Sequence, residues 1–183
     1  NSMGDYITKK SDMKFQSQEA LKSVQAVIDD ADAALHDKSR RIEDSPIGDA
    51  VAGAVGVGAG LGFAGLYLGG SVVGLSAAGI TSGLAAAGGI VGGGMAAGIA
   101  VLAAPAVLLG GVGLLMASHN RNEKLRRSKE LLYKNAIAKQ TAIIKALKEE
   151  SNADKARIDY LNGLNILLQA AIKDLQHDLG IAA

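Results

Sequence analysis

The feature that most constrains this chain is an uncharged tract of 69 residues, from position 50 to position 118. The tract contains no Asp, Glu, Lys, Arg or His, and it holds 20 of the 24 glycines of the 183-residue chain. An uncharged apolar run of about 18 residues or more is typical of a membrane-spanning helix. Because the tract is several times that length, the sequence predicts that this part of the protein enters a lipid bilayer.

Helix is the predicted conformation of the tract. In hydrocarbon every backbone polar group must be hydrogen bonded internally, which leaves helices and closed barrels. The tract lacks the alternation of polar and apolar residues that barrel strands have. Small residues four positions apart let two helix backbones approach closely, so the glycines are predicted contact points. The alternative is an alanine- and glycine-rich sequence in which this spacing is incidental. The predicted helix-packing residues are Gly56, Gly60, Gly65, Gly69, Gly79, Gly83, Gly89, Gly93, Gly94 and Gly98.

Apolar strength varies along the tract. Residues 95–117 are the strongest spanning candidate, residues 51–70 are acceptable, and residues 71–94 are the weakest. Paired glycines such as Gly69-Gly70 are predicted breaks between helices. Two crossings around the weak middle, forming a hydrophobic helical hairpin, are favoured over four short ones.

Basic residues flank the tract on both sides, and basic residues favour the cytoplasmic face of a membrane. Both termini are therefore expected on the same, cytoplasmic side; the alternative location is a soluble protein. The predicted membrane-flanking basic residues are Arg40, Arg41, Arg121, Lys124, Arg126 and Arg127.

The chain divides into three predicted regions: residues 1–45, 46–118 and 119–183. The first is an amphipathic helix that starts near Ser11 or Asp12 and ends near Asp44. Ser45 and Pro46 then suit the cap and first position of a new helix, which opens the hydrophobic tract. The apolar seam of the N-terminal helix follows heptad spacing. Its members are Leu21, Val24, Ile28, Ala31, Leu35 and Ile42.

The last region is predicted to be an antiparallel hairpin of two helices, residues 119–150 and 153–180, which the N-terminal helix could join as a third member of a bundle. Asn165 lies on the seam of the second helix and could fix its register, and Gly180 is a plausible C-cap. The fold class is therefore all-α, with long coiled-coil-like helices on either side of a glycine-zipper hydrophobic helical hairpin. The seam residues are Leu125, Leu132, Ile137, Ile144 and Leu147, then Ile158, Leu161, Leu168, Ile172, Leu175 and Leu179.

Composition argues against several classes of chemistry. A net charge of +1 and an aromatic content of 3% give no basis for nucleic-acid binding. The chain has no cysteine, and its three histidines lack metal-ligand spacing. Residues 60–65 match a dinucleotide-binding glycine pattern, but no strand precedes them and no acidic residue follows at the required distance. We expect no catalytic residue, no cofactor and no metal site.

Two short segments carry a family resemblance. Residues 75–81 (LSAAGIT) and 92–98 (GGGMAAG) resemble the hydrophobic core of the interferon-alpha-inducible membrane protein family. The resemblance implies a small glycine-rich helical membrane protein tied to organelle membranes, cell death and innate defence. The spacing between the two segments departs from that family, and long charged helices are foreign to it. The architecture is also similar to hydrophobic-hairpin proteins such as α-helical pore-forming toxins and secreted translocator or inclusion-membrane proteins.

The sequence thus predicts a non-enzymatic membrane-inserting protein that self-associates through glycine-zipper helices, with pore formation or membrane perturbation as one specific version. Its expected partners are a lipid bilayer, further copies of itself and a helical protein. The alternative is a soluble helical-bundle interaction module that buries the glycine-rich helices in its core.

Overall fold

The structure is a computed structural model of the chain, and it describes residues 6–58, 61–73 and 123–181. Within these ranges the chain forms helices and connecting turns with no strand, which confirms the all-α class. The helices are α1 (Gln18–His36), α2 (Gly48–Val57), α3 (Phe63–Val73), α6 (Glu123–Glu149) and α7 (Lys155–Leu179), with short 3-10 helices η1 (Lys10–Asp12) and η2 (Ile42–Asp44).

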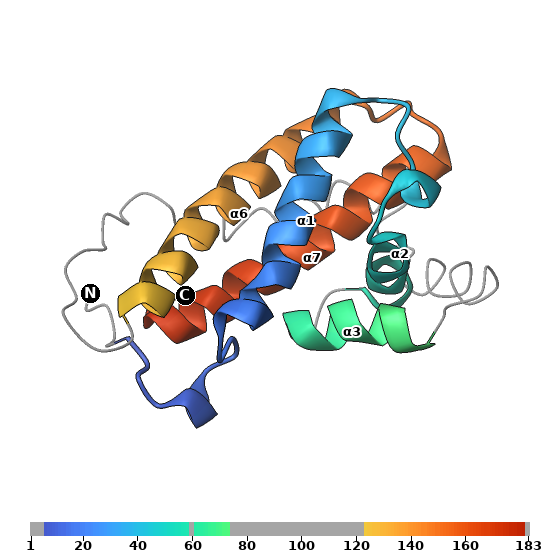
Figure 1. Cartoon of the computed structure of the whole chain (residues 1–183). Coiled ribbons are helices and arrows are strands. Elements are labelled where there is room, and N and C mark those ends of the chain that lie inside the picture. The colour runs from blue at the N-terminus through green and yellow to red at the C-terminus, as the bar shows by residue number, and fades with distance from the viewer. Residues whose placement is uncertain (1–5, 59–60, 74–122, 182–183) are drawn as a thin grey trace.

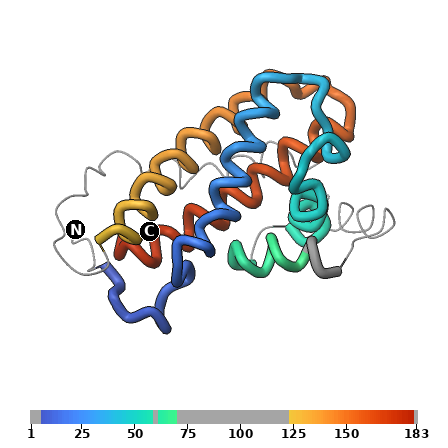
Figure 2. Tube along the Cα trace, viewed as in Figure 1, coloured from blue at the N-terminus to red at the C-terminus, as the bar shows by residue number. Residues whose placement is uncertain are grey.

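Three long helices form the body of the molecule. Helices α6 and α7 pack against each other as an antiparallel pair joined by a short turn, and α1 lies against both (Figures 1 and 2). The chain reverses at Ser151-Asn152, where the sequence predicts the break, and α7 begins when Asp154 accepts the backbone N–H of Arg157 at 2.8 Å. Gly180 ends α7 with a left-handed backbone (φ 69°), which confirms it as the C-cap.

The N-terminal helix is shorter than predicted at both ends. It begins at Gln18, where the Ser17 hydroxyl accepts the backbone N–H of Ala20 at 3.2 Å, and not near Ser11. It ends at His36 because Asp37 turns its carboxylate onto the backbone N–H and hydroxyl of the residue two positions on, an arrangement that competes with the helix. The predicted seam is buried over most of this length, at Leu21, Val24, Ile28 and Ala31.

The first predicted spanning segment, residues 51–70, is two helices in the structure. Gly58 ends α2 with φ 81°, a conformation that side chains disfavour, and α3 starts at Phe63. The predicted break at Gly69-Gly70 is wrong, because α3 continues through it to Val73. No helix in the described part of the chain has the length and apolar character needed to cross a bilayer.

The start of α2 also differs from the prediction. Ser45 does accept a backbone N–H, from Ile47 at 3.0 Å, but the helix begins only at Gly48. A Cβ atom at Gly48 would lie 2.7 Å from the carbonyl oxygen of Ile42, so glycine lets η2 and α2 meet this closely.

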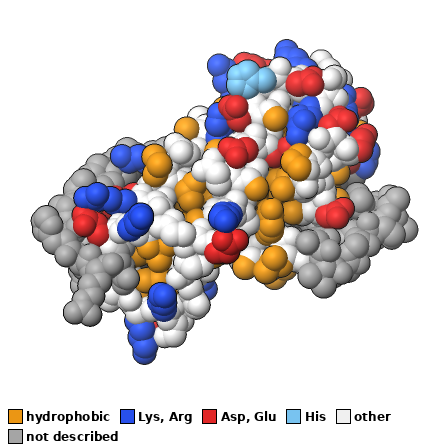
Figure 3. All heavy atoms as spheres, in the orientation of Figure 1, with side chains coloured by type: hydrophobic (Ala, Val, Ile, Leu, Met, Phe, Trp, Pro, Cys, Tyr) orange, Lys and Arg blue, Asp and Glu red, His pale blue; other side chains and the backbone are white. Residues whose placement is uncertain are grey.

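Helix α7 is the centre of the assembly, since α1, α2, α3 and α6 all contact it. Every residue from 157 to 172 is buried, so α7 is enclosed on all sides and not along one seam. Helices from all three predicted regions therefore pack on one element. On the face drawn in Figure 3, charged side chains crowd the end of the bundle that carries the α6–α7 turn, while apolar side chains reach the surface at its middle and lower edge.

Candidate functional site

The candidate site is the face of α7 on which the first two helices of the glycine-rich tract pack, and we call it the docking face. It is defined by Gly163 and Asp174 of α7 with the α2 and α3 residues that contact them. Two polar clusters border it, one at each end of α7.

Gly163 makes the closest contact of this face. A Cβ atom built there would lie 2.6 Å from Cγ1 of Val51, 2.8 Å from its carbonyl oxygen and 2.9 Å from Cγ2 of Val55. Any side chain at this position would therefore push α2 away. Val51 and Val55 are 0% and 1% exposed, so the tract's first helix is buried where it crosses Gly163.

The close-approach glycine thus lies in α7, outside the tract, and sequence reasoning missed it. The available signal was its place in the interior of a helix, where glycine costs about 1 kcal/mol relative to alanine. A glycine at such a position is consistent with a neighbouring backbone that comes close to it.

Helix α3 is held on the docking face by its first residue. The backbone N–H of Phe63 donates to Oδ2 of Asp174 at 3.0 Å. The Phe63 ring is 1% exposed and lies 5.9 Å from the Phe15 ring and 5.5 Å from the Tyr67 ring, measured between centroids. Leu66, one turn further along α3, is 2% exposed.

Two grooves border α3. One of about 400 Å³ lies between α3 and the start of α1, with Phe15, Phe63 and Tyr67 among its walls. The other, of about 250 Å³, lies between α3 and α7 and includes Lys173 and Asp174. Both grooves have more than one polar side chain in their walls, and the described residues contain no cluster of three metal-ligating side chains.

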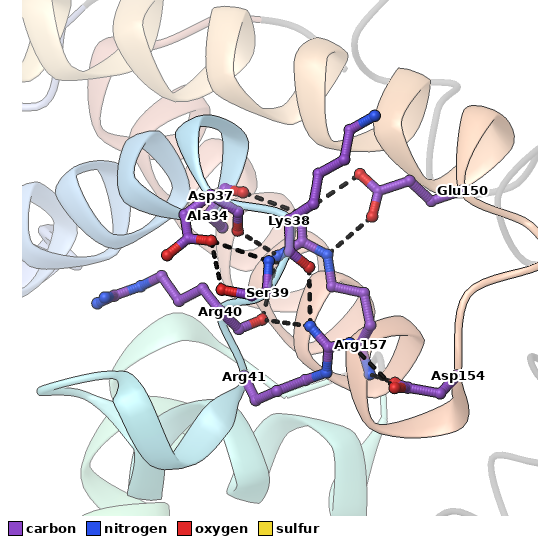
Figure 4. A network of polar contacts seen from close by, with 9 residues as sticks. All are labelled: Ala34, Asp37, Lys38, Ser39, Arg40, Arg41, Glu150, Asp154 and Arg157. Atoms are coloured by element: carbon purple, nitrogen blue, oxygen red, sulfur yellow. Dashed lines mark hydrogen bonds and ion pairs between the residues drawn. The ribbon is translucent and has the colours of Figure 1, made fainter.

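The polar cluster at the α6–α7 turn is centred on Arg157, which is 1% exposed (Figure 4). Its guanidinium donates to the carbonyl oxygens of Ala34, Asp37 and Arg40 at 2.9–3.1 Å and to the Glu150 carboxylate at 2.8 Å. It therefore satisfies carbonyls at the C-terminal end of α1 that have no partner within the helix. The sequence signal was a positive charge in the first turn of a helix, where the helix dipole disfavours it.

Asp30 organises the adjoining part of this cluster. Its carboxylate, 3% exposed, accepts from Arg40 at 2.7 Å, from the Tyr160 hydroxyl at 2.8 Å and from the Ser45 hydroxyl at 2.9 Å. Burial and the hydrogen bond to this carboxylate raise the pKa of Tyr160, so its hydroxyl remains a donor. The hydrogen bond to Asp30 likewise raises the pKa of Arg40. These groups fix the path of the chain from α1 to α2.

The second polar cluster lies at the opposite end of α7. Lys129 and Asp178 form a 2.9 Å ion pair in which both side chains are 0% exposed. Asp178 also accepts the backbone N–H groups of Lys14 at 2.7 Å and Phe15 at 2.9 Å. Burial lowers the pKa of Lys129, opposed by the attraction of Asp178. The carboxylate thus joins the N-terminal segment to α6 and α7.

The predicted membrane-flanking arginines that precede the tract are bound within the protein. Arg40 pairs with Asp30, and Arg41 pairs with Asp154 at 3.0 Å. Of the residues after the tract, Lys124 is exposed, Arg127 is exposed and paired with Glu123, and Arg126 pairs with Glu130. Arg121 lies outside the described residues.

Few of the predicted helix-packing glycines fall within the described ranges. Gly56 is half-buried on α2. On α3, Gly65 is exposed, and no described atom lies within 4 Å of a Cβ built at Gly69. The other predicted glycines lie outside the described residues, namely Gly60, Gly79, Gly83, Gly89, Gly93, Gly94 and Gly98.

Comparisons of the chain with protein-family models, curated proteins and solved structures find no match. The two segments that resemble the interferon-alpha-inducible family, residues 75–81 and 92–98, lie outside the described residues.

Proposed function

We propose that this protein is a non-enzymatic, membrane-inserting helical protein whose glycine-rich tract enters a lipid bilayer while α1, α6 and α7 remain on one side of it. The observation that carries the proposal is the uncharged 69-residue tract, which lies in the sequence between charged helix-forming segments on either side. Self-association through the tract's glycines, and pore formation as one outcome, belong to the same proposal.

The distribution of exposed apolar side chains supports this proposal. Four large hydrophobic residues in the described ranges are more than half exposed, and Val57, Leu61 and Leu68 belong to α2, α3 and their connection. The fourth is Leu131 of α6. Among the described residues, large exposed apolar side chains are therefore most frequent in the first part of the tract, as expected for a segment that leaves the bundle for an apolar phase.

The burial of α2 favours the second candidate, a soluble interaction module. Residues 50–55 are all buried, and α2 contacts α7 closely at Gly163. A bundle that holds its glycine-rich helices in this way could work without a membrane and bind a helical partner. Both candidates are compatible with a protein that changes between a docked and an inserted state.

Membrane extraction and cysteine labelling separate the two candidates. The inserted protein should resist carbonate extraction, and cysteines introduced at Ser17 and Ser151 should react with an impermeant thiol reagent from one side only. A cysteine at Thr81 should be protected or react from the other side. The chain has no native cysteine, so each label reports one position. Release by carbonate, or labelling of Ser17 and Ser151 from opposite sides, would reject the proposed arrangement.

A further inference from the structure

The strongest unassigned feature is a pair of aspartates at the C-terminal end of α7. Asp174 and Asp178 are four residues apart, so they lie on the same face of the helix, one turn from each other. Each carboxylate accepts the backbone N–H of a phenylalanine, Phe63 at 3.0 Å and Phe15 at 2.9 Å. The rings of these two phenylalanines then contact each other, with centroids 5.9 Å apart.

We propose that Asp174 is the release point of a latch that keeps α3 on the bundle, with Asp178 as its fixed anchor, and that opening this latch controls departure of the tract. This inference rests on the function proposed above and concerns its regulation.

The two aspartates differ in how firmly they are held. Asp178 is 0% exposed, pairs with Lys129 and accepts two backbone N–H groups. Asp174 has one hydrogen bond to α3 and borders an open groove that Lys14 and Lys173 also line. Opening therefore begins at Asp174, while Asp178 keeps Phe15 in place.

The carboxylate of Asp174 supplies a cap that α3 cannot supply for itself. The first N–H groups of a helix have no partner within it, and the residue before Phe63 is Gly62, which has no side chain. A Cβ atom at Gly62 would lie 3.4 Å from Oδ2 of Asp174, so the backbone of α3 reaches the carboxylate closely. The acidic group also lies at the favourable, positive end of the helix dipole.

The equilibrium between the docked and inserted states depends on polar contacts, because the apolar side chains that α3 packs against the bundle are buried in both states. Phe63 and Leu66 are buried against the bundle, but bilayer hydrocarbon would bury the same side chains. An equilibrium shifts only by what differs between its two states. The hydrogen bond to Asp174 exists only in the docked state, so its loss favours release.

The test uses the whole chain with a single cysteine replacing Leu66, a residue of α3 that is buried against the bundle, and measures the rate at which this cysteine reacts with a thiol reagent in solution. Asp174→Ala should speed labelling about fivefold, the factor that corresponds to losing one helix N-cap. Asp174→Asn retains an acceptor oxygen, so its labelling rate should lie between that of Asp174→Ala and that of the parent. The matched control is Glu43→Ala, which removes an exposed carboxylate from η2 and should change nothing.

A cysteine at Ala136, buried in α6, distinguishes release of α3 from general unfolding. Asp174→Ala should leave labelling at position 136 unchanged, whereas Asp178→Asn should speed labelling at both positions. Equal rates at position 66 in the parent and in Asp174→Ala would overturn the latch, as would parallel acceleration at both positions in Asp174→Ala.

Vesicles made of phosphatidylcholine and phosphatidylglycerol then test control of insertion. Asp174→Ala should insert into the vesicles faster than the parent. The factor should be about the same as the factor by which the substitution speeds labelling at position 66 in solution. Faster labelling without faster insertion would overturn the regulatory role. Failure of every variant to insert would reject the proposed function itself, while labelling at position 66 would still decide whether Asp174 holds α3.

Discussion

At the scale of single residues, two positions in α7 carry contacts that their residue types alone permit. Gly163 lets the backbone of α2 approach where any Cβ would meet Val51. Arg157 has the planar set of donors needed to reach several carbonyls and a carboxylate at once. Substituting either residue should therefore lower the stability of the protein markedly. Substituting a residue of the same type that lies on the surface should change the stability very little.

Forcing a methyl group into the packed contact at Gly163 should cost about 1–3 kcal/mol. The gain in helix propensity of about 1 kcal/mol offsets part of this cost, so Gly163→Ala should lower the free energy of unfolding by up to about 2 kcal/mol. The matched control is Gly69→Ala in α3, where no described atom lies within 4 Å of the added carbon. Urea unfolding followed by circular dichroism measures both, and equal stability of the two variants would contradict the close contact.

Replacing Arg157 by methionine should cost about 3–5 kcal/mol, because it leaves the buried side of Glu150 and the carbonyls of α1 without their donor. Arg127→Ala is the control: this guanidinium is 74% exposed and paired with Glu123, and such surface pairs are worth about 0.2–1 kcal/mol. Thermal unfolding of the two variants gives the comparison. A loss at Arg157 no larger than the loss at Arg127 would show that the buried cluster is dispensable.

At the scale of elements, the pairing of α6 with α7 contains a buried polar contact. Gln140 donates through Nε2 to Oδ1 of Asn165 at 3.2 Å and to Oε1 of Gln169 at 2.7 Å, with all three residues buried. Such a contact favours one register of the two helices, since sliding either helix by a turn would leave polar groups buried without partners. The register role that the sequence suggests for Asn165 stays a prediction, and in the structure its side chain accepts a hydrogen bond from Gln140.

Replacing Asn165 alone by leucine should destabilise the protein by about 1–3 kcal/mol, although it makes the core more apolar, because Gln140 loses an acceptor. Replacing all three polar residues together, with methionine for each glutamine and leucine for Asn165, should recover most of that loss. Urea unfolding of the single and triple variants measures the difference. A triple variant less stable than the single one would contradict this account.

At the scale of the whole molecule, α7 gathers helices from regions far apart in the sequence. Helix α1 comes from the first predicted region, α2 and α3 from the tract, and α6 from the last. For the glycine-rich tract to leave the bundle, α2 and α3 must therefore separate from α7 while the three long helices stay together. This separation is the large motion that the proposed function requires, and it can be blocked at one place.

A disulfide between cysteines at positions 51 and 163 should block the separation of α2 from α7. The two positions are in contact, since a Cβ at Gly163 would lie 2.6 Å from Cγ1 of Val51. The cysteine at position 163 crowds α2 as an alanine there would, and the disulfide holds α2 on α7 against that crowding. The oxidised variant should not insert into vesicles, and reduction should restore insertion. The single variant Gly163→Cys is the control, because it carries the same crowding against Val51 but cannot form the disulfide, and it should insert under both conditions. Equal insertion by the oxidised and reduced double variant would mean that α2 stays docked during insertion.

The sequence by itself determined the helical class, the uncharged tract, the α6–α7 hairpin with its turn at Ser151-Asn152, and the cap at Gly180. These features depend on composition, periodicity and local backbone preference, which neighbouring residues carry. It did not determine that residues 51–70 form two helices, or that Gly163 receives α2. Those outcomes depend on contacts between residues more than 100 positions apart, such as Phe63 with Asp174. Only tertiary packing brings a carboxylate on one helix to the uncapped end of another, and a local sequence pattern does not predict such a contact.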